Sequence, residues 1–234
     1  MGAVNFEFKG TVDFEYKEFI VRIAIIQSGG ANFLSVSTAL ERLGVECCVT
    51  LEHDIISAAD GILLPGVGCA GFAMQHLHKH NLVDVIKNVK QPLLGICLGM
   101  QILYDFSEEG DVAGIGVIPG KVKKFQYSKE LIVPHMGWNN LIVKSDNDED
   151  KSLLSSADNI LCGLSLTDDV YFVHSYYAPV NNATVAFCNY GVDFTAIVRC
   201  NNFYGMQFHP EKSGNVGTKL LDNFVEIISS NKSQ

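Results

Sequence analysis

A cysteine between two glycines is the sharpest chemical signal in this 234-residue sequence. Residues 92–96 form an apolar run, and its end overlaps the motif Gly95-Ile96-Cys97-Leu98-Gly99. A helical pattern follows the motif. A strand, a tight glycine turn and a helix form the elbow that exposes the nucleophile of many hydrolases, here with cysteine in place of serine. The positive end of the helix favours a thiolate. Taken alone, the motif fits a buried structural cysteine equally well.

A histidine and a carboxylate stand two positions apart at the end of another strand-like run. His209 and Glu211 follow residues 203–208, and Pro210 stiffens the chain between them. A cysteine nucleophile needs a base to accept its proton, and the base needs a group that orients its ring and stabilises the imidazolium. The sequence therefore predicts a catalytic triad of Cys97, His209 and Glu211.

Backbone amides are the groups expected to stabilise the oxyanion of an acyl transfer. Pro65-Gly66-Val67-Gly68 follows an apolar run, and Leu98 follows the nucleophile. Backbone N–H groups can point at the developing charge without a side chain. We expect Val67 and Leu98 to supply the two amides, although a Pro-Gly pair alone is also typical of a simple turn.

The elements that must hold these residues alternate between strands and helices in the first half of the chain. Strands are expected at 21–26, 45–51, 61–64 and 92–96, with helices at 33–43, 74–89 and 98–104. This order is typical of a parallel sheet covered on both faces. Short strands follow at about 115–125, 131–143, 170–177, 183–188, 194–200 and 203–208, before a closing helix at 216–228. We expect an α/β fold with a mixed, mostly parallel sheet flanked by helices and an antiparallel extension in the second half.

Composition excludes several classes of function. A net charge of −9 argues against a nucleic-acid binder and against binding to an anionic membrane. The uncharged stretch at residues 61–78 is too rich in glycine and polar residues to span a membrane. The seven cysteines form no Cys-x-x-Cys pair, and no signal peptide is visible, so we expect a reducing, cytoplasmic location.

One domain is expected over residues 20–230. Residues 1–19 alternate at the strand period and are interpreted as an N-terminal extension or an artificially added segment, outside the site. His76, His78 and His80 are spaced for a solvated helix surface rather than a metal site, so we expect no metal and no cofactor.

The two catalytic motifs together resemble the triad, or class I, glutamine amidotransferases, which cut the side-chain amide of glutamine and pass ammonia to a synthase. Within that family, residues 65–68, 134–139 and 171–177 are similar to the glutaminase subunits of imidazole glycerol phosphate synthases, and residues 107–110 also fit. The likeness runs from about residue 21 to 226. It departs at Gln27, where relatives usually carry Asp.

The resemblance implies a flavodoxin-like sheet and a glutamine pocket built from Gly68, Gln101 and the backbone of Ser175 and Tyr176. Gln101 is one helical turn beyond Cys97, so the two residues share a helix face. The triad implied by the resemblance is the one predicted from the residues themselves.

The resemblance also implies a heterodimer with a (β/α)8-barrel cyclase. That partner joins ammonia to the nucleotide PRFAR and makes imidazole glycerol phosphate and AICAR, while glutaminase activity stays low until partner and ligand arrange the oxyanion amides. Met136, Trp138 and Asn139 would lie at the interface near the ammonia exit. Lys123 and Lys124 are either a docking patch or an exposed strand face.

Two other functions remain open at this point. The chain could serve a different synthase, such as the anthranilate, carbamoyl phosphate, guanylate or pyridoxal phosphate enzyme. It could also be a non-catalytic regulatory subunit of the same fold, although a complete triad argues against this alternative.

Overall fold

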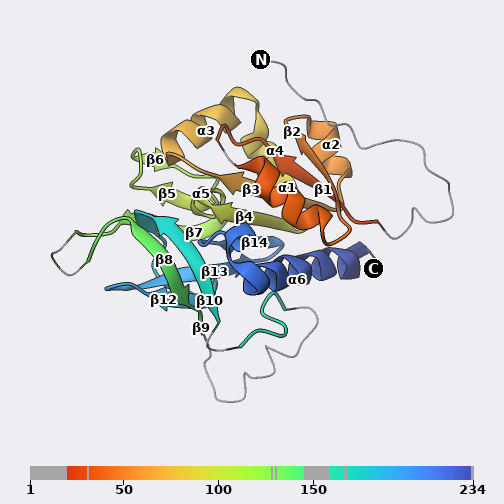
Figure 1. Cartoon of the computed structure of the whole chain (residues 1–234). Coiled ribbons are helices and arrows are strands. Elements are labelled where there is room, and N and C mark those ends of the chain that lie inside the picture. Colours follow the sequence, from red (N-terminus) through yellow and green to blue (C-terminus); the bar gives the residue numbers. More distant parts are fainter. Residues whose placement is uncertain are drawn as a thin grey trace.

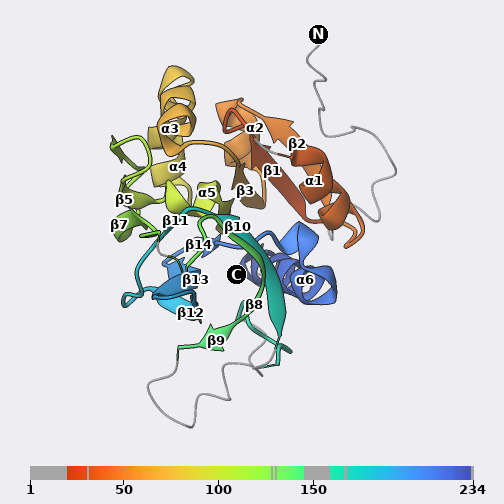
Figure 2. The same ribbon diagram turned by 60° about the vertical axis from the view of Figure 1, so that its left-hand side comes forward.

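An eight-stranded sheet forms the centre of the molecule, with helices on both faces (Figures 1 and 2). The computed structural model describes residues 20–30, 32–127, 129, 131–144, 159–165 and 168–232, so the segment 1–19 lies outside the described residues. In spatial order the strands are β2 (Glu46–Thr50), β1 (Arg22–Ile26), β3 (Gly61–Gly66), β4 (Leu93–Cys97), β14 (Phe203–Met206), β13 (Asp193–Cys200), β12 (Thr184–Asn189) and β9 (Ile142–Val143).

The strands from β2 to β14 pair in parallel, and β13, β12 and β9 continue the sheet in antiparallel pairs. The expected mixed, mostly parallel sheet with an antiparallel extension is therefore confirmed.

Two smaller sheets complete the second half of the chain. The strands β8 (His135–Asn140) and β10 (Asp169–His174) form an antiparallel pair. The other sheet has the order β11 (Tyr176–Tyr177), β7 (Ile118–Lys124), β5 (Tyr104–Ser107) and β6 (Val112–Ala113). The stretch 170–177, predicted as one strand, thus changes from one sheet to the other at Ser175.

The helices cover the two faces of the large sheet according to the alternation along its strands. On β1, Ile23 and Ile25 pack with one core cluster, and Ala24 and Ile26 with the other. The first cluster is completed by α1 (Phe33–Glu41) and α6 (Gly214–Lys232). The second is completed by α2 (His53–Ala58), α3 (Ala70–Lys79), α4 (Leu82–Asn88) and α5 (Leu98–Gln101). Among the described residues, no helix is both long and apolar enough to cross a membrane.

Two predicted helices are wrong in their extent. The helix expected at 74–89 is divided into α3 and α4, because Asn81 adopts a left-handed conformation with φ of 55°. The helix expected at 98–104 ends at Gln101, because Tyr104 begins β5 and pairs with Ile118. The helix α2 was not predicted.

The register of β3, β4 and β14 brings three loops to one edge of the sheet. Cys97 at the end of β4 lies opposite Gly66 of β3, and Ile96 lies opposite Met206 of β14. The carboxyl ends of parallel strands are the usual place for a binding crevice in an open α/β sheet. The glycine-rich loop, Cys97 and the His209 segment are therefore neighbours.

Candidate active site

The backbone turns sharply at Cys97, which ends β4 and begins α5. Cys97 has φ of 54° and ψ of −110°, a conformation that costs a non-glycine residue on the order of 1–3 kcal/mol. The flanking glycines allow this turn: a Cβ on Gly95 would lie 2.7 Å from the Met100 nitrogen, and one on Gly99 would overlap the Leu64 carbonyl. Both motif glycines are thus required by close backbone contacts.

His209 and Glu211 form a buried pair beside Cys97. His209 Nδ1 lies 2.8 Å from Glu211 Oε1, and the two side chains are only 6% and 2% exposed. Glu211 belongs to a short 3-10 helix, η3 (Pro210–Lys212), which directly follows the histidine. Burial acts to lower the pKa of His209, but its interactions with Cys97 and Glu211 outweigh burial and raise that pKa to about 9. The arrangement therefore holds a proton on the imidazole.

A cavity of about 340 Å³ opens over Cys97 and His209. The sequence-predicted residues that line it with them are Val67, Gly68, Leu98, Gln101, Ser175 and Tyr176. Glu211 is not among the lining residues, because it contacts His209 from behind. The space suits a small amino acid, and its residue types suit nucleophilic attack on an acyl carbon.

The two expected oxyanion amides differ in this conformation. The Val67 N–H donates to the carbonyl oxygen of Gly30 at 2.8 Å, so it is engaged away from the nucleophile. The Ser28 hydroxyl donates to the Pro65 carbonyl at 2.5 Å, which ties the same loop to the tip of β1. Leu98 is the first residue of α5, where an N–H has no acceptor within its own helix. The Leu98 amide borders the cavity that contains Cys97, whereas the Val67 amide is committed to Gly30.

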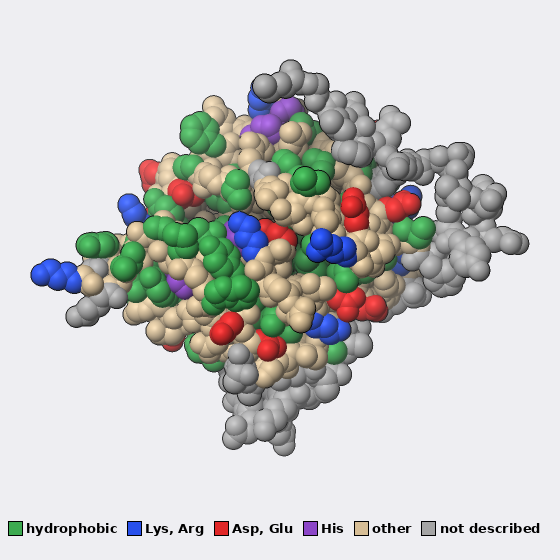
Figure 3. Space-filling view, viewed as in Figure 1, with side chains coloured by type: hydrophobic (Ala, Val, Ile, Leu, Met, Phe, Trp, Pro, Cys, Tyr) green, Lys and Arg blue, Asp and Glu red, His purple; other side chains and the backbone are tan. Residues whose placement is uncertain are grey.

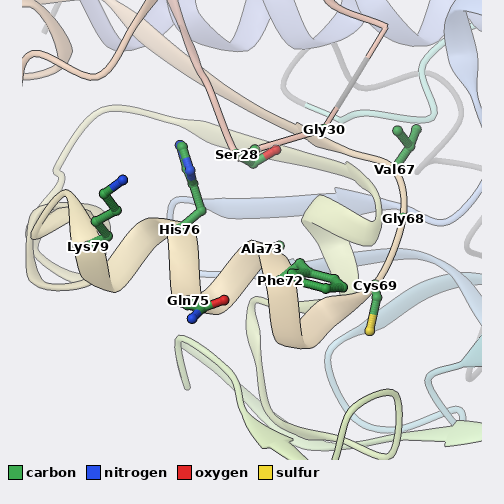
Figure 4. Close-up of a pocket in the computed structure, with 11 residues that line it drawn as sticks. Ser28, Gly30, Val67, Gly68, Cys69, Phe72, Ala73, Gln75, His76 and Lys79 are labelled. Atoms are coloured by element: carbon green, nitrogen blue, oxygen red, sulfur yellow. The ribbon is translucent and has the colours of Figure 1, made fainter.

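The loop that carries Val67 has space on both sides. A second, larger cavity of about 670 Å³ lies between the tip of β1 and α3, and Val67 and Gly68 line both cavities (Figure 4). Gly68 has φ of +100°, and a Cβ built on it would meet no atom within 4 Å. The loop is therefore unrestrained on the Gly68 side of Val67, whereas on the other side Gly66 packs against Leu98 and Gly99.

Gln207 is a site residue that the sequence analysis missed. Its fully buried side chain donates from Nε2 to Cys97 Sγ at 3.8 Å, and its Oε1 accepts from Gln101 Nε2 at 2.9 Å. The available signal was a glutamine between Met206 and Phe208 in an otherwise apolar run, because a buried polar side chain requires a partner.

Glu109 is a second residue without a predicted role. It lines the cavity over Cys97 and His209, and its Oε2 accepts from the Ala70 N–H at 2.9 Å. Burial raises the pKa of this carboxyl. In the sequence, residues 107–110 fit the family resemblance but carry no chemical pattern, because a Glu-Glu pair is typical of an exposed surface.

The residues predicted for the partner interface do not line the cavity. Met136 and Trp138 are 64% and 58% exposed on β8, where Figure 3 shows hydrophobic side chains gathered on the surface. Asn139 is half-buried instead and donates to the Asn189 carbonyl at 3.0 Å. Lys123 and Lys124 are exposed on β7, which pairs with β11 beside the cavity.

His76 lies in α3, and His80 directly follows that helix. The rings of His76 and His80 lie 4.6 Å apart, and no three metal-binding side chains gather anywhere in the described part of the chain.

A family model and several relatives of known name agree on one family. The family model described as glutamine amidotransferase class-I matches residues 24–228. "Imidazole glycerol phosphate synthase subunit HisH 2" of Legionella pneumophila is 44% identical over 208 residues, which are 89% of this chain and 99% of that protein. The subunits HisH of Xanthomonas campestris and Bacteroides fragilis are each 43% identical, with 88% of this chain covered and 97% and 100% of theirs.

Solved structures show the same fold. A putative GMP synthase protein of Thermoplasma acidophilum has a TM-score of 0.68 at 19% identity, covering 92% of this chain and 96% of its own. A glutamine amidotransferase of Thermotoga maritima has a TM-score of 0.58 at 15% identity, covering 89% and 98%.

Proposed function

The chain belongs to the class-I glutamine amidotransferases and, within them, to the imidazole glycerol phosphate synthase subunits HisH, and from this premise we propose how its residues produce and deliver ammonia. Membership makes the protein an enzyme subunit of histidine biosynthesis with a partner subunit. The observation that carries the mechanism is the convergence of Cys97 and His209 at the cavity, with Glu211 bonded to His209 behind it.

The nucleophile is the Cys97 sulfur, and L-glutamine is the substrate. The Cys97 thiolate attacks the side-chain carboxamide carbon of glutamine. This carbon becomes tetrahedral, and negative charge develops on its oxygen. His209, protonated because its pKa is raised to about 9, gives its proton to the departing nitrogen, and the carbon–nitrogen bond breaks to release ammonia. His209 then takes a proton from water, which attacks the thioester and releases glutamate. Glu211 orients the ring throughout.

The oxyanion is stabilised by the amides of Leu98 and Val67. Because the Val67 N–H is bonded to Gly30 in the conformation described, this peptide must rotate before it can donate to the oxyanion. Glutamine hydrolysis is therefore slow in the isolated chain and is accelerated when the partner with its nucleotide favours the rotated loop.

Gly68, Gln101, Ser175 and Tyr176 form the glutamine pocket. Gln101 uses its amide nitrogen for the Tyr176 carbonyl at 2.8 Å and for Gln207, so Oε1 is the atom left to accept from the substrate. Glu109 is the anionic group of the cavity and takes the α-ammonium of glutamine.

The partner is a (β/α)8-barrel cyclase that docks over Met136, Trp138 and the segment that includes Asn139, with Lys123 and Lys124 at the edge of the contact. Exposed Met and Trp side chains on one strand are typical of a protein interface. Ammonia loses its nucleophilicity when it is protonated, so it passes directly to the site where PRFAR becomes imidazole glycerol phosphate and AICAR. The assembly is a heterodimer. The cytoplasm is the proposed compartment, since none of the seven cysteines, all of which the structure describes, forms a disulfide.

The test is the Cys97→Ala variant in the complex reconstituted with its partner. Glutamine-dependent cyclisation and glutamate release should be lost, and ammonia-dependent cyclisation should continue at the rate of the unchanged complex. Glutamate release by the unchanged protein should rise when partner and nucleotide are added. Full glutamine-dependent activity in Cys97→Ala would overturn the mechanism.

A further inference from the structure

Two buried histidines lie directly opposite each other where β8 and β10 pair. His135 Nδ1 and His174 Nε2 are 2.9 Å apart, and the two residues are 3% and 6% exposed. His174 also lines the catalytic cavity. Burial lowers the pKa of His135 to about 4 and that of His174 to about 3, so both rings are neutral near pH 7. The proposed mechanism uses neither ring.

The hydrogen bonds of the pair fix the position of each proton. His174 Nδ1 lies 2.8 Å from the Tyr176 carbonyl oxygen, which can only accept, so Nδ1 carries the hydrogen. His174 Nε2 is then an acceptor and takes the hydrogen of His135 Nδ1. His135 Nε2 accepts in turn, and the Asn139 amide nitrogen faces it at 3.5 Å. The direction of donation therefore runs from β8 towards the cavity.

The Tyr176 carbonyl continues this connection to the nucleophile. It also accepts from Gln101 Nε2 at 2.8 Å, and the other hydrogen of that amide goes to Gln207 Oε1. Gln207 is thereby oriented with its own amide nitrogen towards Cys97 Sγ. We call the connected set Asn139, His135, His174, the Tyr176 carbonyl, Gln101 and Gln207 the polar chain.

Packing alone does not account for the histidines. The His135 ring stacks between Tyr190 and Phe172, with centroids 4.0 Å and 4.9 Å away. A phenylalanine would fill the same space without burying two ring nitrogens, whose desolvation is costly unless both are paired. The structure retains the nitrogens and pairs them in series, which favours a role for the N–H groups themselves.

The outer end of the polar chain lies on the strand proposed for docking. Along β8 the side chains alternate, with His135 buried and Met136 and Trp138 exposed on the other face. Because His135, Met136 and Trp138 belong to the same short strand, a shift of β8 on docking would also move the His135 ring.

We propose that His135 and His174 are positioning residues: through the polar chain they fix the Tyr176 carbonyl and the Gln101 and Gln207 amides, so that the placement of β8 controls how the Cys97 sulfur is held. This inference rests on the proposed glutaminase function. It adds a role for residues that contact neither the reacting carbon nor the leaving group.

Two variants of His135 separate the N–H group from the packing of the ring. His135→Phe keeps the stacked ring and removes the Nδ1–H. His135→Asn keeps an N–H near the Nδ1 position and removes the ring. His135→Phe should therefore be the more stable variant, and His135→Asn should be the more active one. The order of the two variants by stability is thus opposite to their order by activity.

The measurements are made on the reconstituted complex with partner and nucleotide. His135→Phe should lower kcat for glutamine hydrolysis about tenfold, since small misplacement of a reacting group has effects of this size. It should also slow alkylation of Cys97 by iodoacetamide, and His135→Asn should restore both rates to within about twofold of the unchanged protein. Ammonia-dependent cyclisation should be the same in all three, because the partner carries it out, and an equal partner affinity by surface plasmon resonance shows that docking is intact. Where His135→Phe does not fold, His135→Gln replaces it, because its amide reaches the Nε2 position instead.

The matched control is Thr184→Val, which removes a buried hydroxyl pair between Thr184 and Thr195, 2.8 Å apart and outside the polar chain. It should lower stability and leave kcat unchanged. The inference is overturned if His135→Phe retains the kcat of the unchanged complex. It is also overturned if kcat follows thermal stability across His135→Phe, His135→Asn and Thr184→Val. An unchanged complex that releases no glutamate, like Cys97→Ala, would instead contradict the proposed function.

Discussion

The Val67 N–H donates to the Gly30 carbonyl oxygen across 2.8 Å, although the cavity that contains Cys97 borders the same residue. The Gly30 carbonyl, in the loop after β1, thus competes with the oxyanion for the Val67 N–H. The Ser28 hydroxyl, which bonds the Pro65 carbonyl, holds the beginning of the same loop. A single hydrogen bond is worth about 1 kcal/mol net, so the competition can be decided by a modest change in contacts made by a partner.

Crowding Gly30 should release this loop. A Cβ at Gly30 would lie 3.0 Å from the Val67 carbonyl oxygen, so Gly30→Ala weakens the resting conformation. We expect partner-independent glutamate release to rise roughly three- to tenfold, a shift of about 1 kcal/mol. Gly71→Ala is the control, because its Cβ would meet neighbours at 3.8 Å or more. An unaltered basal rate in a folded Gly30→Ala protein would contradict the competing role of this bond.

Removing the charge of Glu211 should lower both the His209 pKa and kcat. Glu211→Gln retains a hydrogen-bond acceptor at about the same place but no negative charge to stabilise the imidazolium. We expect kcat for glutamine hydrolysis to fall by about two orders of magnitude or more. NMR titration of the His209 ring should give a pKa near 9 in the unchanged protein and a lower one in the variant.

The stability effect of this pair has a defined sign. Because the folded pKa lies above the usual 6.5, the stabilisation is complete below about pH 6.5 and is lost as the pH rises through about 9. Urea unfolding at pH 6.5, 8 and 9.5 should show this loss in the unchanged protein and a smaller one in Glu211→Gln. Equal losses in both would remove Glu211 as the cause.

The positions of Cys97 and His209 were predictable because each stands in a local pattern that fixes its place in the fold. Gly95 and Gly99 mark the turn at Cys97, and a strand ends shortly before His209. Parallel pairing then brings strand ends together without any further information.

What the sequence did not predict depends on long-range contacts. Nothing near Gly30 indicates that its carbonyl binds the Val67 N–H, since the bond joins loops 37 positions apart. The pairing of His135 with His174 likewise requires the register of β8 and β10, which form a sheet of their own. The break at Asn81 was missed because only its left-handed backbone interrupts an otherwise helical pattern.

Neutralising Glu109 should weaken glutamine binding. Glu109→Gln keeps the size of the side chain and an oxygen that can accept from the Ala70 N–H. If the carboxylate takes the substrate ammonium, KM for glutamine should rise roughly tenfold with a smaller change in kcat, as expected for loss of one charge-assisted hydrogen bond. Steady-state glutamate release over a range of glutamine concentrations measures both constants. An unchanged KM would remove Glu109 from the ammonium site.

The proposed interface can be separated into apolar and charged parts. Trp138→Ala removes a large exposed ring and should weaken partner binding by roughly 2 kcal/mol if Trp138 is a central contact. Reversal of Lys123 and Lys124 to Glu should change the association rate and its dependence on salt more than the dissociation rate. Surface plasmon resonance at low and high salt distinguishes the two. Affinity and salt dependence that stay the same after charge reversal would exclude the lysines from docking.

The buried histidine pair should make the protein sensitive to acid. Unfolding returns His135 and His174 to a pKa near 6.5 from about 4 and 3, so the unfolded state gains protons first as the pH falls. The stability is present above about pH 6.5 and is lost towards pH 4. Each histidine should add up to about 1.4 kcal/mol per pH unit to the slope of the unfolding free energy in this range. Urea unfolding between pH 4.5 and 7 should give a shallower slope for His135→Asn. His78→Asn, which replaces an exposed histidine of α3, should keep the original slope, and a matching slope in both variants would contradict a buried neutral His135.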